Sequence, residues 1–122
     1  MNKKEIANTL LEAEKEFGLI PVLYRVFGKT FKVRLDFSES ICKASIDELS
    51  LSVRSHNALR RAGIATLGDL IEILNEGNLK SVRNLGAKSY SEIQSTMLRF
   101  GYDKLSDNEK IRFFAELVDD NT

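Results

Sequence analysis

Two glycine-centred joints between short helical stretches constrain the fold of this protein most strongly. The first joint is "RRAGIATLGDL" (60–70) and the second is "SVRNLGAKSYSEI" (81–93). In each, one helical pattern ends, an apolar residue or two and a glycine follow, and a new helical pattern starts at once. This arrangement is typical of helix–hairpin–helix modules, in which a tight turn joins two short helices.

Helix signals around the joints agree with that interpretation. Ser52 is a suitable N-cap for a helix before the first joint, and Thr66 with Asp69 three residues later forms a pair like a capping box after it. The next helix carries an apolar stripe at i, i+3, i+4 and i+7, made by Leu67, Leu70, Ile71 and Leu74. Residues 46–102 therefore predict a mainly α fold, a compact bundle of short helices with two helix–hairpin–helix-like joints.

The N-terminal segment shows two kinds of pattern. Residues 3–17 indicate a helix that ends at Gly18. Residues 23–37 alternate around Gly28-Lys29, which favours a β-hairpin. A helix broken at Gly28 is the alternative.

A division into three parts follows from these patterns. The polar stretch "SESICKAS" (38–45) is the boundary between the first two parts, and a capping box at Ser106 and Glu109 begins a helix in the third. We expect an N-terminal appendage of a helix plus a β-hairpin (1–45), a helical domain (46–102), and a C-terminal helix with an acidic tail (103–122).

Composition excludes several classes of protein. No run of 18 apolar residues occurs, so no membrane-spanning helix is expected, and the mixed charges of the first 17 residues do not fit a signal peptide. One cysteine and one histidine predict neither an internal disulfide nor a metal cluster. We expect no metal, no cofactor and no membrane partner, and the cytoplasm is the simplest compartment.

The start of the second helix, after the joint "NLGAKS" (84–89), could hold a phosphate. A helix that begins here leaves the backbone N–H groups of Ala87, Lys88 and Ser89 without intrahelical partners, and the helix dipole favours an anion in front of them. Gly86 has no side chain to block the approach. The Lys88 ammonium and the Ser89 hydroxyl add further donors. A plain turn followed by a helix start is the alternative.

A nucleotide-binding P-loop does not fit the same stretch. That loop requires the spacing G-x-x-x-x-G-K-[ST] after a buried strand. Here an alanine separates Gly86 from Lys88, the preceding glycine is Gly77, and no strand is expected before it. Asp69, Glu72 and Glu92 look like ordinary carboxylates on helix surfaces, so we expect no enzymatic activity.

A second polar cluster lies on the helix before the first joint. Arg54, Asn57, Ala58 and Arg61 fall at i, i+3, i+4 and i+7, so they share one face. Arginine, asparagine and a small residue together suit contact with a nucleic-acid backbone and insertion into a narrow A·T-rich minor groove. The alternative is an ordinary solvated face.

Residues 46–102 closely resemble the C-terminal domain of the bacterial RNA polymerase alpha subunit. The resemblance rests on "LSVRSHNAL", "GIATLGDL" and "NLGAKSYSEI", which occur in the family's order and spacing. It implies a compact helical fold that binds A·T-rich DNA through the minor groove. The large assembly domain of the alpha subunit has no counterpart in this sequence, so we expect a stand-alone relative.

The resemblance also implies which residues contact DNA. The principal arginine of the family falls on Arg54, and the other contacts fall on Asn57, Ala58, Gly86, Lys88, Ser89 and Glu92. Ala58 stands where the family often has cysteine, and Arg83 stands where a proline usually precedes "NLG". The family's acidic patch for the sigma factor would fall on Asp47, Glu48 and Ser50, and the last of these is not acidic.

The leading hypothesis is therefore a DNA-binding module that acts in transcription or its regulation. The alternative is a protein-interaction module that binds RNA polymerase or a regulator without direct DNA contact. RNA polymerase, its sigma factor and transcription regulators are the candidate protein partners under either hypothesis. With 18 basic and 18 acidic residues the formal net charge is zero, which predicts weak DNA binding by the isolated protein.

Overall fold

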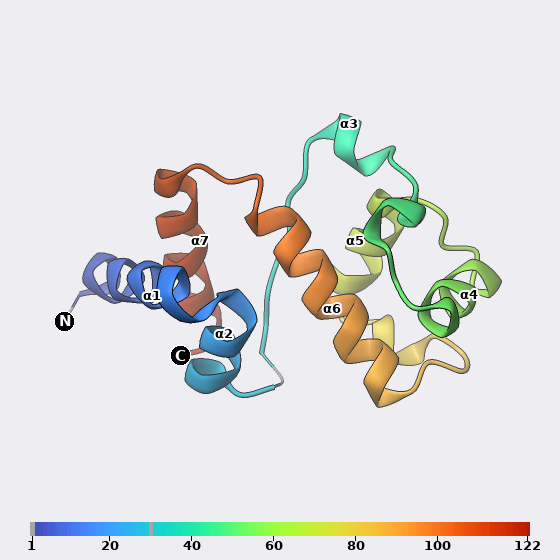
Figure 1. The fold of residues 1–122 in the computed structure, drawn as a ribbon, viewed down its shortest axis with the longest axis horizontal. Helices are drawn as coiled ribbons and strands as arrows, with labels where there is room; N and C mark the ends of the chain where they lie inside the picture. Colours follow the sequence, from blue (N-terminus) through green and yellow to red (C-terminus); the bar gives the residue numbers. More distant parts are fainter. Residues whose placement is uncertain (1, 30) are drawn as a thin grey trace. The chain divides into compact units, whose positions relative to one another are not determined.

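The computed structural model describes residues 2–29 and 31–122, and these residues are mainly helical (Figure 1). They contain no strand, and one isolated bridge pairs Ser45 with Thr66. Two short 3₁₀ helices, η1 (Ile46–Leu49) and η2 (Leu79–Ser81), accompany the α-helices. The α-helices are α1 (Lys3–Phe17), α2 (Leu19–Phe27), α3 (Glu39–Cys42), α4 (Val53–Arg61), α5 (Leu67–Asn75), α6 (Ala87–Tyr102) and α7 (Asp107–Asp120). The predicted mainly α class is confirmed.

The protein divides into two compact units. One comprises residues 34–101, and the other comprises residues 1–33 together with 102–122. The first contains both glycine-centred joints. No helix among the described residues is long and apolar enough to cross a lipid bilayer.

The unit of residues 34–101 has an apolar core supplied by every helix from η1 to α6. Its fully buried side chains include Ile46, Leu59, Leu67, Leu70, Leu79, Ile93, Met97 and Leu98. The segment before η1 is fixed to the first joint by backbone hydrogen bonds from Ile46 N–H to Ala65 O (3.0 Å) and from Leu67 N–H to Ala44 O (2.9 Å). These bonds hold η1 beside the start of α5.

The two joints turn the backbone in different ways. After α4, Gly63 adopts a φ of 82°, a left-handed conformation that glycine tolerates without strain. Thr66 then caps α5 with the predicted capping box, in which Thr66 Oγ1 accepts from Asp69 N–H and the Asp69 carboxylate accepts from Thr66 N–H. In the second joint the left-handed residue is Asn84, with a φ of 66°, and Gly86 is not left-handed.

Residues 34–37 are extended and pack against the same unit. Asn75 Oδ1 accepts from Leu35 N–H and Asn75 Nδ2 donates to Leu35 O, both at 2.9 Å. The Phe37 ring lies 6.0 Å from that of Phe100 and covers Gly101 so closely that a β-carbon there would collide with it. Any larger residue at position 101 would therefore displace the Phe37 ring.

The other unit pairs α1 with α7 and with α2. Lys3 forms an ion pair with Asp119 (2.6 Å), and the Asn121 side chain holds the backbone of Lys32 through hydrogen bonds of 2.7 and 2.8 Å. Tyr102 packs edge-on against the ring of Phe114. Contacts between residues that are distant in the sequence thus hold the two segments of this unit, residues 1–33 and 102–122, together.

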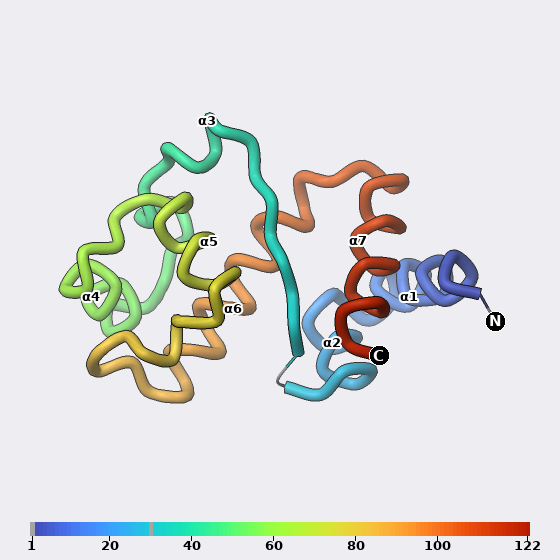
Figure 2. Tube along the Cα trace, turned by 180° about the vertical axis from the view of Figure 1, so that it is seen from behind, coloured from blue at the N-terminus to red at the C-terminus, as the bar shows by residue number. Residues whose placement is uncertain are grey.

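The β-hairpin predicted for residues 23–37 is wrong. Of the alternative, a helix broken at Gly28, only the helix before Gly28 is observed. Residues 19–27 form α2, because Leu19, Val22 and Leu23 make a buried stripe at helical spacing. Figure 2 shows the described residues after Gly28 as an extended run that leads to α3 with no strand partner. Thr30, within the predicted hairpin, lies outside the described residues.

Candidate nucleic-acid interface

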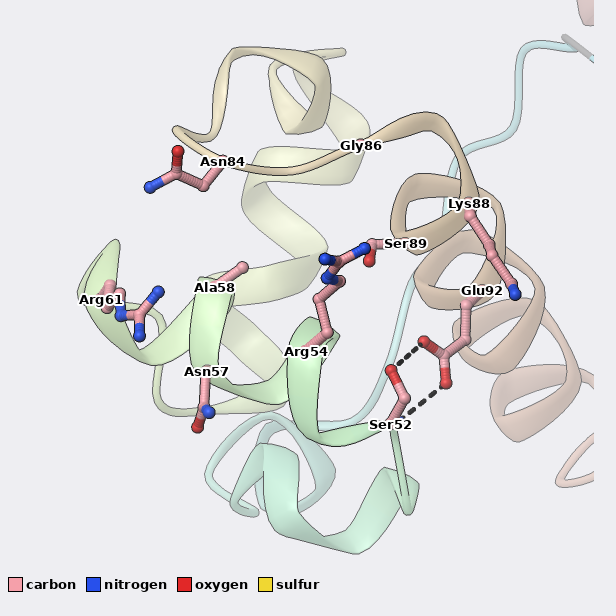
Figure 3. Close-up of a pocket in the computed structure, with 10 residues that line it drawn as sticks. All are labelled: Ser52, Arg54, Asn57, Ala58, Arg61, Asn84, Gly86, Lys88, Ser89 and Glu92. Atoms are coloured by element: carbon pink, nitrogen blue, oxygen red, sulfur yellow. Dashed lines mark hydrogen bonds between the residues drawn. The ribbon is translucent and has the colours of Figure 1, made fainter.

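All seven residues predicted as DNA contacts border one open hollow in the unit of residues 34–101. The hollow has a volume of about 990 Å³ and lies between α4 and the stretch that runs from the second joint into α6 (Figure 3). Its lining residues are Ser52, Arg54, Asn57, Ala58, Arg61, Asn84, Gly86, Lys88, Ser89 and Glu92. The fold therefore brings together two polar clusters that are separate in the sequence.

Three lining residues are not among the predicted contacts. Arg61 could be added from the sequence, since it shares a helical face with Arg54 and Asn57. Ser52 is predicted only as the N-cap of α4, a role it has through the hydrogen bond from Ser55 N–H to Ser52 Oγ (3.3 Å). Asn84 was not predicted, although asparagine is one of the few residues that readily adopt the left-handed conformation observed there.

Arg54 is the exposed cation at the start of α4. Its side chain extends into the hollow in the direction of Ser89 (Figure 3). In residues 34–101, all of which are described, no hydrogen bond or ion pair engages its guanidinium group. Ala58 and Ser89 are nearly covered, whereas Asn57 is exposed. Within residues 34–101 Arg54 is therefore an unpaired charge beside small and largely covered side chains.

The start of α6 presents the predicted arrangement of backbone donors. α6 begins at Ala87, and the first backbone hydrogen bond of the helix runs from Tyr90 N–H to Gly86 O (2.9 Å). The N–H groups of Ala87, Lys88 and Ser89 consequently lack partners inside the helix. A β-carbon added to Gly86 would meet nothing within 4 Å, so there is open space at this residue, which borders the hollow together with Lys88 and Ser89.

Glu92 has a structural role that the sequence did not reveal. Its carboxylate accepts the N–H and the hydroxyl of Ser52, both at 2.8 Å, and also the hydroxyl of Ser55. Partial burial raises the pKa of Glu92, but the hydrogen bonds from Ser55 and Ser52 outweigh it and leave the pKa below its usual value. Glu92 thus joins α6 to the first turn of α4 and is engaged within the protein.

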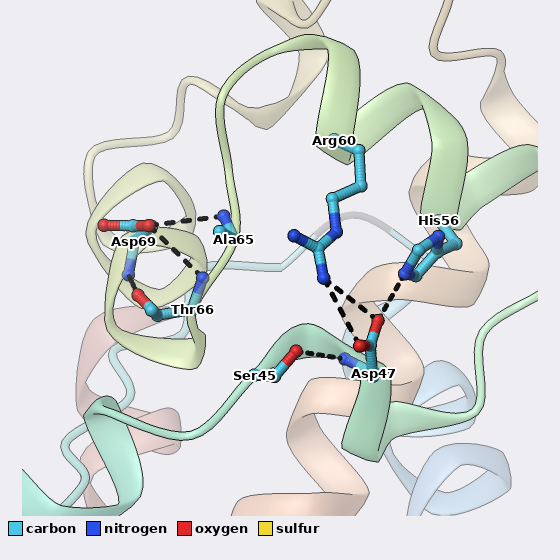
Figure 4. Close-up of polar contacts among 7 residues, drawn as sticks. All are labelled: Ser45, Asp47, His56, Arg60, Ala65, Thr66 and Asp69. Carbon is cyan, nitrogen blue, oxygen red and sulfur yellow. Dashed lines mark hydrogen bonds and ion pairs between the residues drawn. The ribbon is translucent and has the colours of Figure 1, made fainter.

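Other carboxylates of this unit also have partners within the fold (Figure 4). Asp47 Oδ1 lies 2.6 Å from His56 Nε2 and accepts from Arg60 Nη2 at 3.2 Å. The hydrogen bond with His56, followed by those with Arg60, lowers the pKa of Asp47. Among the residues predicted for a sigma-factor patch, Asp47 is therefore paired, while Glu48 and Ser50 are exposed.

The fold and the hollow together identify the class of protein. It is a helical module in which two tight joints place polar residues around one surface. The family of C-terminal domains of the bacterial RNA polymerase alpha subunit matches residues 36–99, and the protein belongs to this family. The resemblance inferred from the three motifs is thereby confirmed.

Several alpha subunits are similar to this protein. The DNA-directed RNA polymerase subunit alpha of Carboxydothermus hydrogenoformans is 42% identical over 74 residues, which cover 61% of this sequence and 23% of that subunit. The subunit of Nitratiruptor sp. is 49% identical over 67 residues, or 53% of this sequence and 20% of the subunit. The protein spans about a fifth of the length of the curated relatives it matches. No solved structure matches it.

Proposed function

We propose that the protein is a DNA-binding module that contacts the A·T-rich minor groove and the phosphate backbone in transcription or its regulation. The observation that carries the proposal is the hollow that unites the unpaired Arg54 with the open first turn of α6. Membership of the alpha C-terminal domain family supports the same function.

Each part of the hollow has its own task in this proposal. Arg54 enters the minor groove, because A·T-rich tracts narrow that groove and concentrate its negative potential. The free amides of the α6 first turn hold a phosphate oxygen with help from Lys88. Gly86 leaves room for the backbone to approach, and Asn57 adds a polar contact at the exposed edge.

We expect the interaction to be weak for the isolated protein. The formal net charge is zero, so few phosphates are neutralised and few counterions are released. Dissociation constants in the range of about 10⁻⁴–10⁻⁶ M are ordinary for contacts dominated by the backbone at physiological salt. A tether, a protein partner or a second copy on the DNA would raise the occupancy.

Fluorescence anisotropy with a labelled A·T-rich duplex at low salt tests the proposal. Arg54→Ala should lose most of the binding. Arg60→Ala is the matched control, because it removes the same charge from the same helix at a residue that is held by Asp47. Equal binding by wild type and Arg54→Ala, or no binding by either, would refute the proposal.

A protein-interaction function is the second candidate, and exposed apolar side chains favour it. Phe17 and Val26, in the unit that lies outside the family match, are 63% and 52% exposed. RNA polymerase, a sigma factor or a transcription regulator is the expected class of partner, in the cytoplasm. Capture of partners from lysate after nuclease treatment separates the two functions, because partners bridged by DNA disappear.

A further inference from the structure

We propose that Arg61 and Arg83 form a second phosphate-binding site beside the main hollow. This inference rests on the proposed DNA-binding function and extends it to a backbone phosphate other than the one at the start of α6. Arg61 is the last residue of α4, and Arg83 lies in the second joint. The two arginines, with Ala62 and Asn84, line a smaller hollow of about 230 Å³.

Both arginines are available to a ligand. Each is exposed, and in residues 34–101, where every residue is described, no hydrogen bond or ion pair engages either guanidinium group. Arg60, the neighbour of Arg61 in the sequence, is different because its guanidinium is bound to Asp47 at 3.2 Å. The fold therefore neutralises one of the two consecutive arginines and leaves the other free.

The local charge favours an anion at this position. Within the fully described unit of residues 34–101, no carboxylate lines the smaller hollow. In the main hollow of the same unit the single lining carboxylate is Glu92, which is occupied by Ser52 and Ser55. A guanidinium group offers a planar fork of donors that matches phosphate oxygens, and two such groups around one hollow can contact a phosphate from two sides.

The smaller hollow is continuous with the proposed DNA surface. Arg61 and Asn84 line both hollows. A DNA strand whose one phosphate lies at the α6 first turn can therefore continue along the second joint to Arg83 and the end of α4. Phosphate contacts of this kind fix the position of a duplex and carry no sequence information.

The test is the salt dependence of DNA binding by the protein of residues 1–122. Anisotropy titrations at several salt concentrations use an A·T-rich and a G·C-rich duplex with wild type, Arg61→Ala, Arg83→Ala, the double variant and Arg60→Ala. Each lost phosphate contact should reduce the steepness of the plot of log K against log salt concentration by about 0.9. At 0.1 M salt this change corresponds to binding that is weaker by about eightfold, because a slope of about 0.9 acts over one decade below 1 M salt. We expect Arg61→Ala and Arg83→Ala to do so equally on both duplexes, and Arg60→Ala to change neither quantity.

The outcomes separate this inference from the function on which it rests. If wild type binds, Arg54→Ala loses binding, and the Arg61→Ala/Arg83→Ala double variant keeps both affinity and slope, the second site is refuted and the proposed function stands. If wild type does not bind DNA, both are refuted. Restoration of the slope by Arg61→Lys/Arg83→Lys would support a contact made through charge, and circular dichroism verifies that each variant is folded.

Discussion

At the scale of single residues, a substitution of Gly86 should change DNA affinity without lowering the stability of the fold. Its backbone is not left-handed, and an added β-carbon would point into open space. Gly86→Ala should keep or raise stability, by up to about 1 kcal/mol, because alanine restricts the unfolded state. Its methyl group should weaken DNA binding by standing in front of the α6 amides. Thermal denaturation and anisotropy check the two effects, and unchanged affinity would show that no phosphate approaches there.

Glu92 should matter for stability more than for direct DNA contact. Glu92→Gln replaces a charged acceptor of several hydrogen bonds, so we expect a loss of about 1–2 kcal/mol in the free energy of unfolding. Glu72→Gln is the control, because Glu72 is exposed on α5 and should tolerate the change. Urea denaturation measures both. Equal stability of Glu92→Gln and wild type would contradict the structural role.

The same carboxylate predicts a pH dependence. Because the folded-state pKa of Glu92 lies below its usual value of 4.5, the unfolded state binds its proton first as the pH falls. The stabilisation by Glu92 is therefore complete above that value and is lost as the pH drops through the folded-state pKa. The stability difference between wild type and Glu92→Gln should shrink as the pH falls from about 5 through the lowered folded-state pKa of Glu92. A difference that is constant with pH would contradict this assignment.

The residues on one helical face could be predicted, whereas their long-range partners could not. Arg54, Asn57 and Ala58 share a face because helical spacing alone determines it. The bonds from Ser52 and Ser55 to Glu92 depend on the packing of α4 against α6, which no local pattern encodes. The resemblance therefore led to Glu92 as a predicted DNA contact, and the sequence did not reveal that Ser52 and Ser55 engage it.

At the scale of secondary-structure elements, the cap of α5 fixes the geometry of the first joint. Thr66→Ala removes the acceptor of the Asp69 N–H group, and it should cost about 1 kcal/mol, within the range of roughly 0.5–2 kcal/mol usual for N-caps. Denaturant midpoints measure the loss. An unchanged midpoint would mean that water replaces the hydroxyl without cost.

The sequence predicts a helix correctly where an N-cap residue and an apolar stripe indicate the same helix. It predicts less well where only one of these patterns is present. The capping boxes at Thr66 and Ser106 are both predicted from sequence and are both present. The strand prediction for residues 23–37 fails because their short apolar runs fit a strand as well as a helix end. The stripe that decides for α2 begins at Leu19, before the stretch interpreted as a strand.

At the scale of the whole molecule, the compact unit that contains both joints begins at Arg34. The sequence suggested a boundary after residue 45. Leu35 is buried and hydrogen-bonded to Asn75, and Phe37 covers Gly101. We expect a fragment of residues 34–102 to be more stable than one of residues 46–102 by at least about 2 kcal/mol, the value of one buried leucine. Urea denaturation compares them, and equal stability would place the boundary at residue 45.

We expect the α4 face and the start of α6 to act as one DNA-binding surface. Mapping of backbone amide chemical shifts, as a short A·T-rich duplex is added to the protein of residues 1–122, tests this expectation. We expect residues 54–58 and 86–92 to shift together and to saturate at the same DNA concentration. Shifts confined to residues 2–29 and 102–122, or no shifts at all, would contradict it.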